Sequence, residues 1–246
     1  MITAAAVCPA PPLLARELTG TDPVLPELRQ ACLDATAALL AADPDLVAVV
    51  GVAAETRQWD ARAVLDLGQY APALRAAATC PEQADGNRDH AASLPLPLGL
   101  AARLLDEAGH GGSRALHSIS DRATAWECAA LGAELATAAA RVALLVMADG
   151  SARRGPKAPG HLDERSVPFD AEVERALRTG DMAALLALDA GLASELMATG
   201  RPAWQVLAGA LAGRQPASGI LYSGDPFGVA YLVASLTPVA EGIGPG

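Results

Sequence analysis

Aromatic residues are scarce in this chain of 246 residues: only 3% are Phe, Trp or Tyr, although 52% of all residues are hydrophobic. A chain with this much apolar side-chain material can bury a sizeable core, so we do not expect it to be disordered. The shortage of aromatics means that the core must be built from Ala, Leu and Val. Such small side chains let helices lie close to a sheet, but each buries little area.

Basic residues are also few. The chain has 18 Lys and Arg against 28 Asp and Glu, which gives a formal net charge of −10. A protein that binds a nucleic-acid duplex needs a stripe of Lys and Arg to neutralise phosphates. The one basic cluster here is Arg153, Arg154 and Lys157. We therefore expect no nucleic-acid partner, and the acidity favours solubility.

The four cysteines, at positions 8, 32, 80 and 128, are 24, 48 and 48 residues apart. These spacings match no zinc pattern and no CxxC motif, and so few thiols favour a reduced, cytoplasmic protein. Residues 1–15 are apolar, but they lack a basic start, and Pro9, Pro11 and Pro12 interrupt any helix, so no signal peptide is expected. No uncharged run reaches the roughly 18 residues of a membrane span.

Apolar runs of strand length alternate with helical periodicity along the chain. We predict strands over 2–8, 46–53, 62–67, 114–120, 141–148, 218–222 and 228–236. We predict helices over 26–42, 97–108, 169–179, 181–188, 191–199 and 202–212, and one that Ser120 and Asp121 cap and that runs to about residue 140. The alternation predicts a single α/β domain over 1–246, a three-layer αβα sandwich around a mixed or mostly parallel sheet.

Binding sites in such sheets form in the loops that follow the carboxyl ends of the strands. Three loops satisfy this rule, at residues 8–12, 53–58 and 149–168. The third is longer than most connections, which is typical of a functional loop.

Several segments in order along the chain carry a resemblance to one family. They are CPAPPLL (8–14), LPLPLGLAARLLDEAG (94–109), ADGSA (148–152) with APGH (158–161) and VPFD (167–170), GRPAWQVLAGA (200–210) and GVAYLV (228–233). Together they resemble the class III extradiol ring-cleavage dioxygenases of the catalytic-subunit-B type and the related Memo-like proteins. The likeness covers most of the chain and implies an α/β fold.

The resemblance implies a specific chemistry. Enzymes of this family hold Fe(II) with two histidines and a carboxylate, which leaves positions on the metal for a catechol and O₂. A further histidine, in the loop that corresponds to ADGSA, transfers protons. Some members pair with a smaller subunit.

This sequence departs from that pattern at three places. Ala10 stands where the first-strand histidine is expected, residues 50–54 contain no histidine, and Ala152 stands in the proton-transfer position. A methyl group can neither bind a metal nor transfer a proton. Glu195 is the candidate for the carboxylate ligand. We therefore expect no cofactor, and Fe(II) only if the ancestral activity is retained.

The loop after residue 148 keeps three polar candidates. Asp149 and Ser151 either shape a polar pocket or cap the loop by binding backbone donors. His161 either replaces the lost acid/base or ligand, or is a solvated loop residue.

Two more candidates follow the first two strands. Cys8 is either a thiolate ligand or a packing residue. Glu55 is either a metal ligand or a surface carboxylate.

Three functional hypotheses follow. The first is a non-catalytic descendant that uses the pocket to bind a small molecule, such as a small aromatic ligand, or a protein. The second is a working ring-cleavage dioxygenase in which Cys8, Glu55, His161 or Glu195 converge on a metal. The third is an interaction subunit, in a homo-oligomer or with a small partner chain.

Overall fold

The computed structural model describes residues 1–20, 24–68, 70–71 and 93–238. Within these ranges one sheet contains seven strands in the order β3-β4-β2-β5-β1-β7-β6. The strands are β1 (Ile2–Cys8), β2 (Leu46–Ala53), β3 (Arg57–Trp59), β4 (Arg114–Ser120), β5 (Val142–Met147), β6 (Pro216–Gly224) and β7 (Tyr231–Pro238). The helices are η1 (Pro12–Leu14), α1 (Arg16–Thr19), α2 (Pro26–Leu40), α4 (Leu96–Glu107), α5 (Ala125–Leu135), α6 (Ser166–Thr179), α7 (Met182–Leu186), α8 (Ala190–Glu195) and α9 (Arg201–Ala210).

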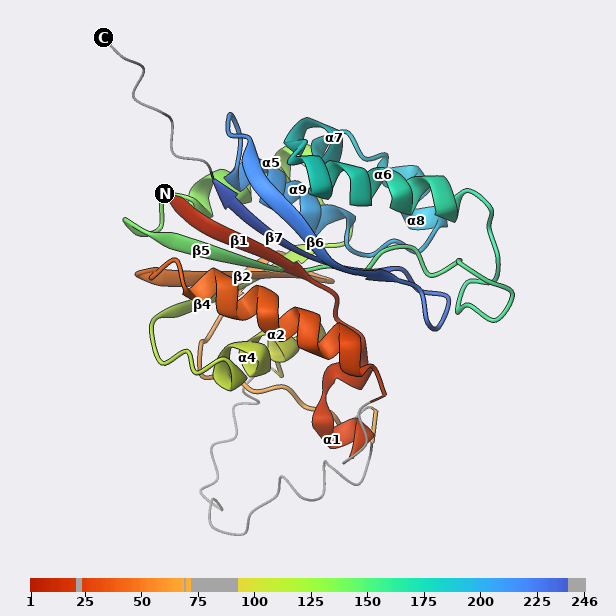
Figure 1. The fold of residues 1–246 in the computed structure, drawn as a ribbon, viewed down its shortest axis with the longest axis horizontal. Helices are drawn as coiled ribbons and strands as arrows, with labels where there is room; N and C mark the ends of the chain where they lie inside the picture. Colours follow the sequence, from red (N-terminus) through yellow and green to blue (C-terminus); the bar gives the residue numbers. More distant parts are fainter. Residues whose placement is uncertain (21–23, 69, 72–92, 239–246) are drawn as a thin grey trace.

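The predicted three-layer architecture is confirmed. Helices α2 and α4 cover one face of the sheet, and α5 to α9 cover the other (Figure 1). The strands β4, β2, β5 and β1 are parallel, whereas β3, β7 and β6 pair antiparallel at the two sides. The sheet is therefore mixed, with a parallel centre.

The connections between the parallel strands explain which helix covers which face. From β1 to β2 and on to β4 the chain moves in one direction across the sheet, and α2 and α4 lie on the same face. From β4 the chain returns to β5, between β2 and β1, and α5 lies on the opposite face. Right-handed crossovers require this change of face when the direction reverses.

The central strands are buried on both sides, as their continuous apolar runs predict. Along β5, Leu144 points into the core under α5 to α9, and Leu145 points into the core under α2 and α4. Ala and Gly bring the layers close together. A Cβ on Gly51 in β2, for example, would lie 2.7 Å from the side chain of Pro97 in α4.

The predicted strand over 62–67 is wrong. This segment is irregular, and the Leu94 N–H donates to the carbonyl of Val64 at 3.0 Å. The edge strand is instead β3, which pairs antiparallel with β4. Three residues with exposed, polar neighbours give no periodic signal, so pairing with β4 decides their conformation.

The predicted helix over 120–140 is shorter than expected. Thr124 is the N-cap of α5, and its side chain and that of Glu127 form a reciprocal capping box. Ser120 ends β4, and the Asp121 N–H donates to the carbonyl of Ala53 at 3.1 Å. The capping box therefore sets the start of the helix, whereas Ser120 belongs to β4 and Asp121 to the turn that follows it.

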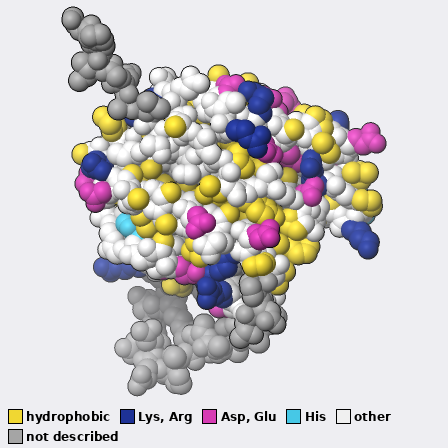
Figure 2. All heavy atoms as spheres, in the orientation of Figure 1, with side chains coloured by type: hydrophobic (Ala, Val, Ile, Leu, Met, Phe, Trp, Pro, Cys, Tyr) yellow, Lys and Arg dark blue, Asp and Glu magenta, His cyan; other side chains and the backbone are white. Residues whose placement is uncertain are grey.

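The surface carries charges of both signs. On the face shown in Figure 2, Lys and Arg side chains are scattered among Asp and Glu and form no continuous stripe. Among the helices in the described part of the chain, none has both the length and the apolar character that a membrane crossing requires.

Candidate functional site

The three predicted loops lie at one edge of the sheet. In the parallel centre, β5 lies between β1 and β2, and Met147 of β5 is level with both Cys8 and Gly51. The carboxyl ends of these strands therefore meet at one edge, where ligands bind in open α/β sheets.

Asp149 joins two of these loops. Its carboxylate accepts a hydrogen bond of 2.8 Å from the backbone N–H of Ala10, and its carbonyl accepts one of 2.8 Å from Gly200. Burial raises the pKa of Asp149 to about 6, although the bond from Ala10 acts in the opposite direction. Burial also raises the pKa of Tyr231 to about 12, and the nearby charge of Asp149 adds to this shift. Asp149 therefore connects the loop after β1 to the loop after β5.

Ser151 binds a second carboxylate, that of Asp170, which is buried. The N–H of Ser151 donates to Asp170 at 2.9 Å, and its hydroxyl donates to the other oxygen of the same carboxylate. Burial raises the pKa of Asp170, whereas these bonds and the charge of Arg154 lower it. Asp170, from the VPFD segment, therefore anchors the loop to α6.

The rest of the long loop is also held by backbone bonds. Ala152 donates to the carbonyl of Leu196 at 3.0 Å, and its own carbonyl accepts from Gly160 at 2.9 Å. The Arg154 N–H donates to the carbonyl of Gly228 at 3.0 Å. These bonds fix the loop against the end of α8 and the turn before β7. The loop ends at residue 165, because α6 begins at Ser166, three residues before the predicted start.

The remaining candidates do not gather at one point. Cys8 is fully buried, and its thiol faces the carbonyl of Cys32 at 4.0 Å. Glu55 and His161 are exposed. The Glu195 carboxylate is on the surface, where it accepts from Arg165 at 2.7 Å.

No group of three or more His, Cys, Asp or Glu side chains within the described ranges is arranged to hold a metal ion. The convergence of Cys8, Glu55, His161 and Glu195 on a metal is therefore not found. The reason is positional: Glu195 pairs with an arginine on the surface, and Cys8 packs against α2.

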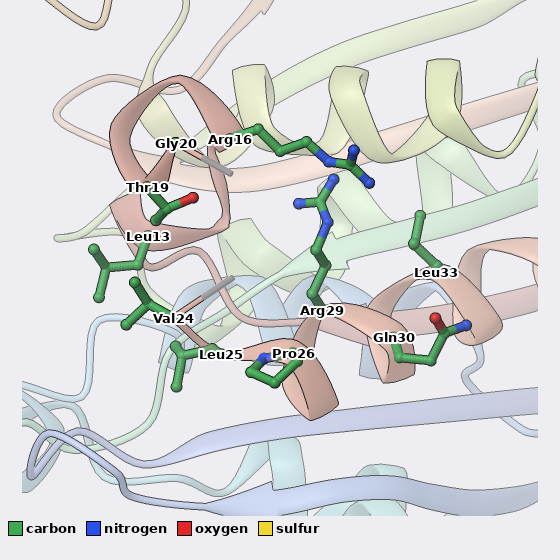
Figure 3. Close-up of a pocket in the computed structure, with 10 residues that line it drawn as sticks. All are labelled: Leu13, Arg16, Thr19, Gly20, Val24, Leu25, Pro26, Arg29, Gln30 and Leu33. Atoms are coloured by element: carbon green, nitrogen blue, oxygen red, sulfur yellow. The ribbon is translucent and has the colours of Figure 1, made fainter. Parts of the chain in front are cut away.

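A cavity of about 590 Å³ opens at the same edge, where the chain leaves β1 and enters α2. Two arginines, Arg16 and Arg29, extend into it (Figure 3). The Arg29 guanidinium donates to the carbonyl of Leu14 at 2.6 Å and to the carboxylate of Glu107, and Arg16 lies 3.8 Å from that same carboxylate.

Sequence reasoning missed this arginine pair. Arg29 and Glu107 are 78 residues apart and lie on α2 and α4, so no local spacing connects them. The one available signal was position, since Arg16 lies four residues after the loop that follows the first strand.

No family model matches the chain, and no curated protein matches it either. Among solved structures, the crystal structure of an uncharacterized protein from Escherichia coli K12 is similar, with a TM-score of 0.54 and 15% sequence identity. The alignment covers 96% of this chain and 99% of that one. At this identity the similarity extends to the fold alone.

Proposed function

We propose that this protein is a non-catalytic relative of the extradiol dioxygenases that binds a small organic molecule at the carboxyl edge of its sheet. The observation that carries the proposal is the hydrogen bond between Asp149 and Ala10. Where the family resemblance implies iron ligands, a partly buried carboxylate instead accepts a hydrogen bond from a backbone N–H and holds two loops together.

The side chains at the implied positions do not fit Fe(II). Ala10 and Ala152 are buried, and Ala53 at the end of β2 is partly exposed. A non-haem Fe(II) site of this type needs two imidazoles and a carboxylate. Methyl groups supply no donor, and Asp149 alone cannot replace three ligands. The side chains at the carboxyl ends of the strands therefore favour the binding of a ligand over the activation of O₂ at a metal.

Metal analysis of protein purified without chelator tests this proposal. We expect iron, manganese and zinc far below one ion per chain. After anaerobic incubation with Fe(II), we expect no O₂ uptake with catechol or 3,4-dihydroxybenzoate as substrate. His161→Ala and Glu195→Gln remove the two side chains that an unusual iron site would use, and neither should change the metal content.

The opposite result would be one iron per chain together with O₂ uptake that His161→Ala abolishes. That outcome would establish a working dioxygenase with unusual ligands and would refute the non-catalytic role.

A further inference from the structure

The cavity between α1 and α2 combines two positive charges with an apolar wall. Its lining residues, all within the described part of the chain, are Leu13, Arg16, Thr19, Gly20, Val24, Leu25, Pro26, Arg29, Gln30 and Leu33. Ten residues thus contribute two guanidinium groups and no carboxylate, in a protein whose net charge is −10. The local charge is therefore opposite to that of the whole molecule.

Arg29 is held in place before any ligand arrives. Its side chain is only 13% exposed, and its bond to the carbonyl of Leu14 fixes the guanidinium at the cavity. A mostly buried cation is costly unless it is paired. Its partner, Glu107, also lies 3.8 Å from Arg16, so one carboxylate serves two arginines.

A second carboxylate lies nearby, on the neighbouring residue of α1. Glu17 accepts a hydrogen bond of 2.6 Å from Arg103 on α4, and its charge also interacts with that of Arg29. Three arginines therefore face two carboxylates, and the group keeps an excess of one positive charge beside the cavity.

The apolar side of the cavity is formed by Leu13, Val24 and Leu25, which lie away from the guanidinium groups in Figure 3. The hydroxyl of Thr19 and the amide of Gln30 add polar groups to the lining. A volume of about 590 Å³ lies within the range of small-molecule sites, which combine apolar walls with a few polar groups that orient the ligand.

We propose that this cavity binds a small organic acid, with its carboxylate beside Arg16 and Arg29 and its hydrocarbon or ring against the apolar wall. The inference rests on the proposed function, because it names the ligand class that the non-catalytic protein would bind. Arginine recognises carboxylates through paired N–H donors, and these charge-assisted bonds are stronger than neutral ones.

Glu107 makes the proposal sharply testable, because it competes with the ligand for the same guanidinium groups. Glu107→Gln removes the competing charge and should tighten the binding of an acid, whereas Arg16→Gln removes a guanidinium and should weaken it. Each change should alter Kd by about tenfold, as expected for one charge-assisted contact. A nonspecific loss of structure would weaken binding in both variants.

The experiment is calorimetric titration of the full chain at constant ionic strength with phenylacetate, the matched neutral phenylacetamide and inorganic phosphate. We expect phenylacetate to bind at least tenfold more tightly than either of the others. Arg178→Gln removes an arginine that pairs with Glu174 on α6, far along the chain from the cavity, and should leave Kd unchanged. The side chain of Arg16 is 70% exposed, so the Arg16→Gln variant should fold like the wild type.

Three results would overturn the proposal: no saturable binding of phenylacetate, equal binding of the amide, or equal binding of phosphate. Loss of affinity in Glu107→Gln would also contradict it. The two proposals fail separately. An iron-free protein that binds no acid refutes the acid site alone, whereas stoichiometric iron refutes the non-catalytic role whatever the titration shows.

Discussion

Asp149 and Ala10 belong to loops that follow different strands, and a hydrogen bond of 2.8 Å from the Ala10 N–H to the Asp149 carboxylate joins them. Burial raises the pKa of this partly exposed carboxyl from 3.8 to about 6. Ionisation of Asp149 at neutral pH therefore lowers the free energy of unfolding relative to the protonated form. The carboxylate still accepts the hydrogen bond that positions the loop after β1.

The first prediction concerns the pH dependence of stability. Because the folded-state pKa of Asp149 is raised, the protonated side chain contributes to the free energy of unfolding. This contribution is fully present below about pH 4 and is lost as pH rises through about 6. Asp149→Asn keeps an oxygen that can accept from Ala10 and never ionises. Its stability relative to the wild type should rise by about 2 kcal/mol between pH 4 and pH 7, as urea denaturation would measure.

Asp34→Asn provides the control, because Asp34 lies on the exposed side of α2. Its stability difference from the wild type should change far less over the same pH range. A difference for Asp149→Asn that stays constant from pH 4 to pH 7 would show that Asp149 does not titrate in this interval.

The second prediction concerns Ser151 and Asp170. Asp170→Ala leaves both the N–H and the hydroxyl of Ser151 without their acceptor, whereas Ser151→Ala removes only the hydroxyl. We expect a loss of about 1 kcal/mol for Ser151→Ala and about 3 kcal/mol for Asp170→Ala. In the double variant the two losses should not add, because the side chains share one interaction. Strict additivity in denaturation experiments would contradict the coupling.

The parallel centre of the fold could be predicted because each of its strands is a continuous apolar run. The segments 2–8 and 46–53 have this pattern, and both form strands with these limits. The start of α5 was also present in the sequence, since Thr124 and Glu127 have capping-box spacing. Ser120 and Asp121 offered an equally suitable cap, and only pairing of β4 with its neighbours decides between them.

The candidate site was less predictable, for a physical reason. The rule that ligands bind beyond strand ends selected three loops, and the register of β1, β2 and β5 brings these loops to one edge of the sheet. The Asp149–Ala10 bond and the group of Arg16, Arg29 and Glu107 depend on long-range contacts between elements, for which a single sequence has no periodic signal.

The third prediction is that the buried thiols are unreactive. Cys8, Cys32 and Cys128 are fully buried. A hydrogen bond with the Cys32 thiol and burial raise the pKa of Cys8 well above its ordinary value, and burial raises the pKa of Cys128 to about 11. Because the thiolate is the reactive form, these thiols should resist alkylation until the protein unfolds.

Iodoacetamide labelling followed by peptide mass spectrometry can test each position separately. Cys80 lies outside the described residues, and no rate is predicted for it. Rapid labelling of Cys8 in the native protein would show that it is a reactive thiol instead of a packing residue.

The fourth prediction concerns the contact between α5 and α9. A Cβ on Gly132 in α5 would lie 2.1 Å from the carbonyl oxygen of Val206 in α9. In an isolated helix, changing Gly to Ala stabilises by about 1 kcal/mol. Here we expect the opposite sign, a loss of about 2 kcal/mol, because the two backbones must move apart.

Thermal or urea unfolding measures this difference, with Gly111→Ala as the matched substitution. A Cβ on Gly111 meets no atom within 4 Å, so that variant should change the free energy of unfolding by less than about 1 kcal/mol. If Gly132→Ala were as stable as the wild type, α5 and α9 would have to pack less closely than described, and the small residues would not determine the spacing of this layer.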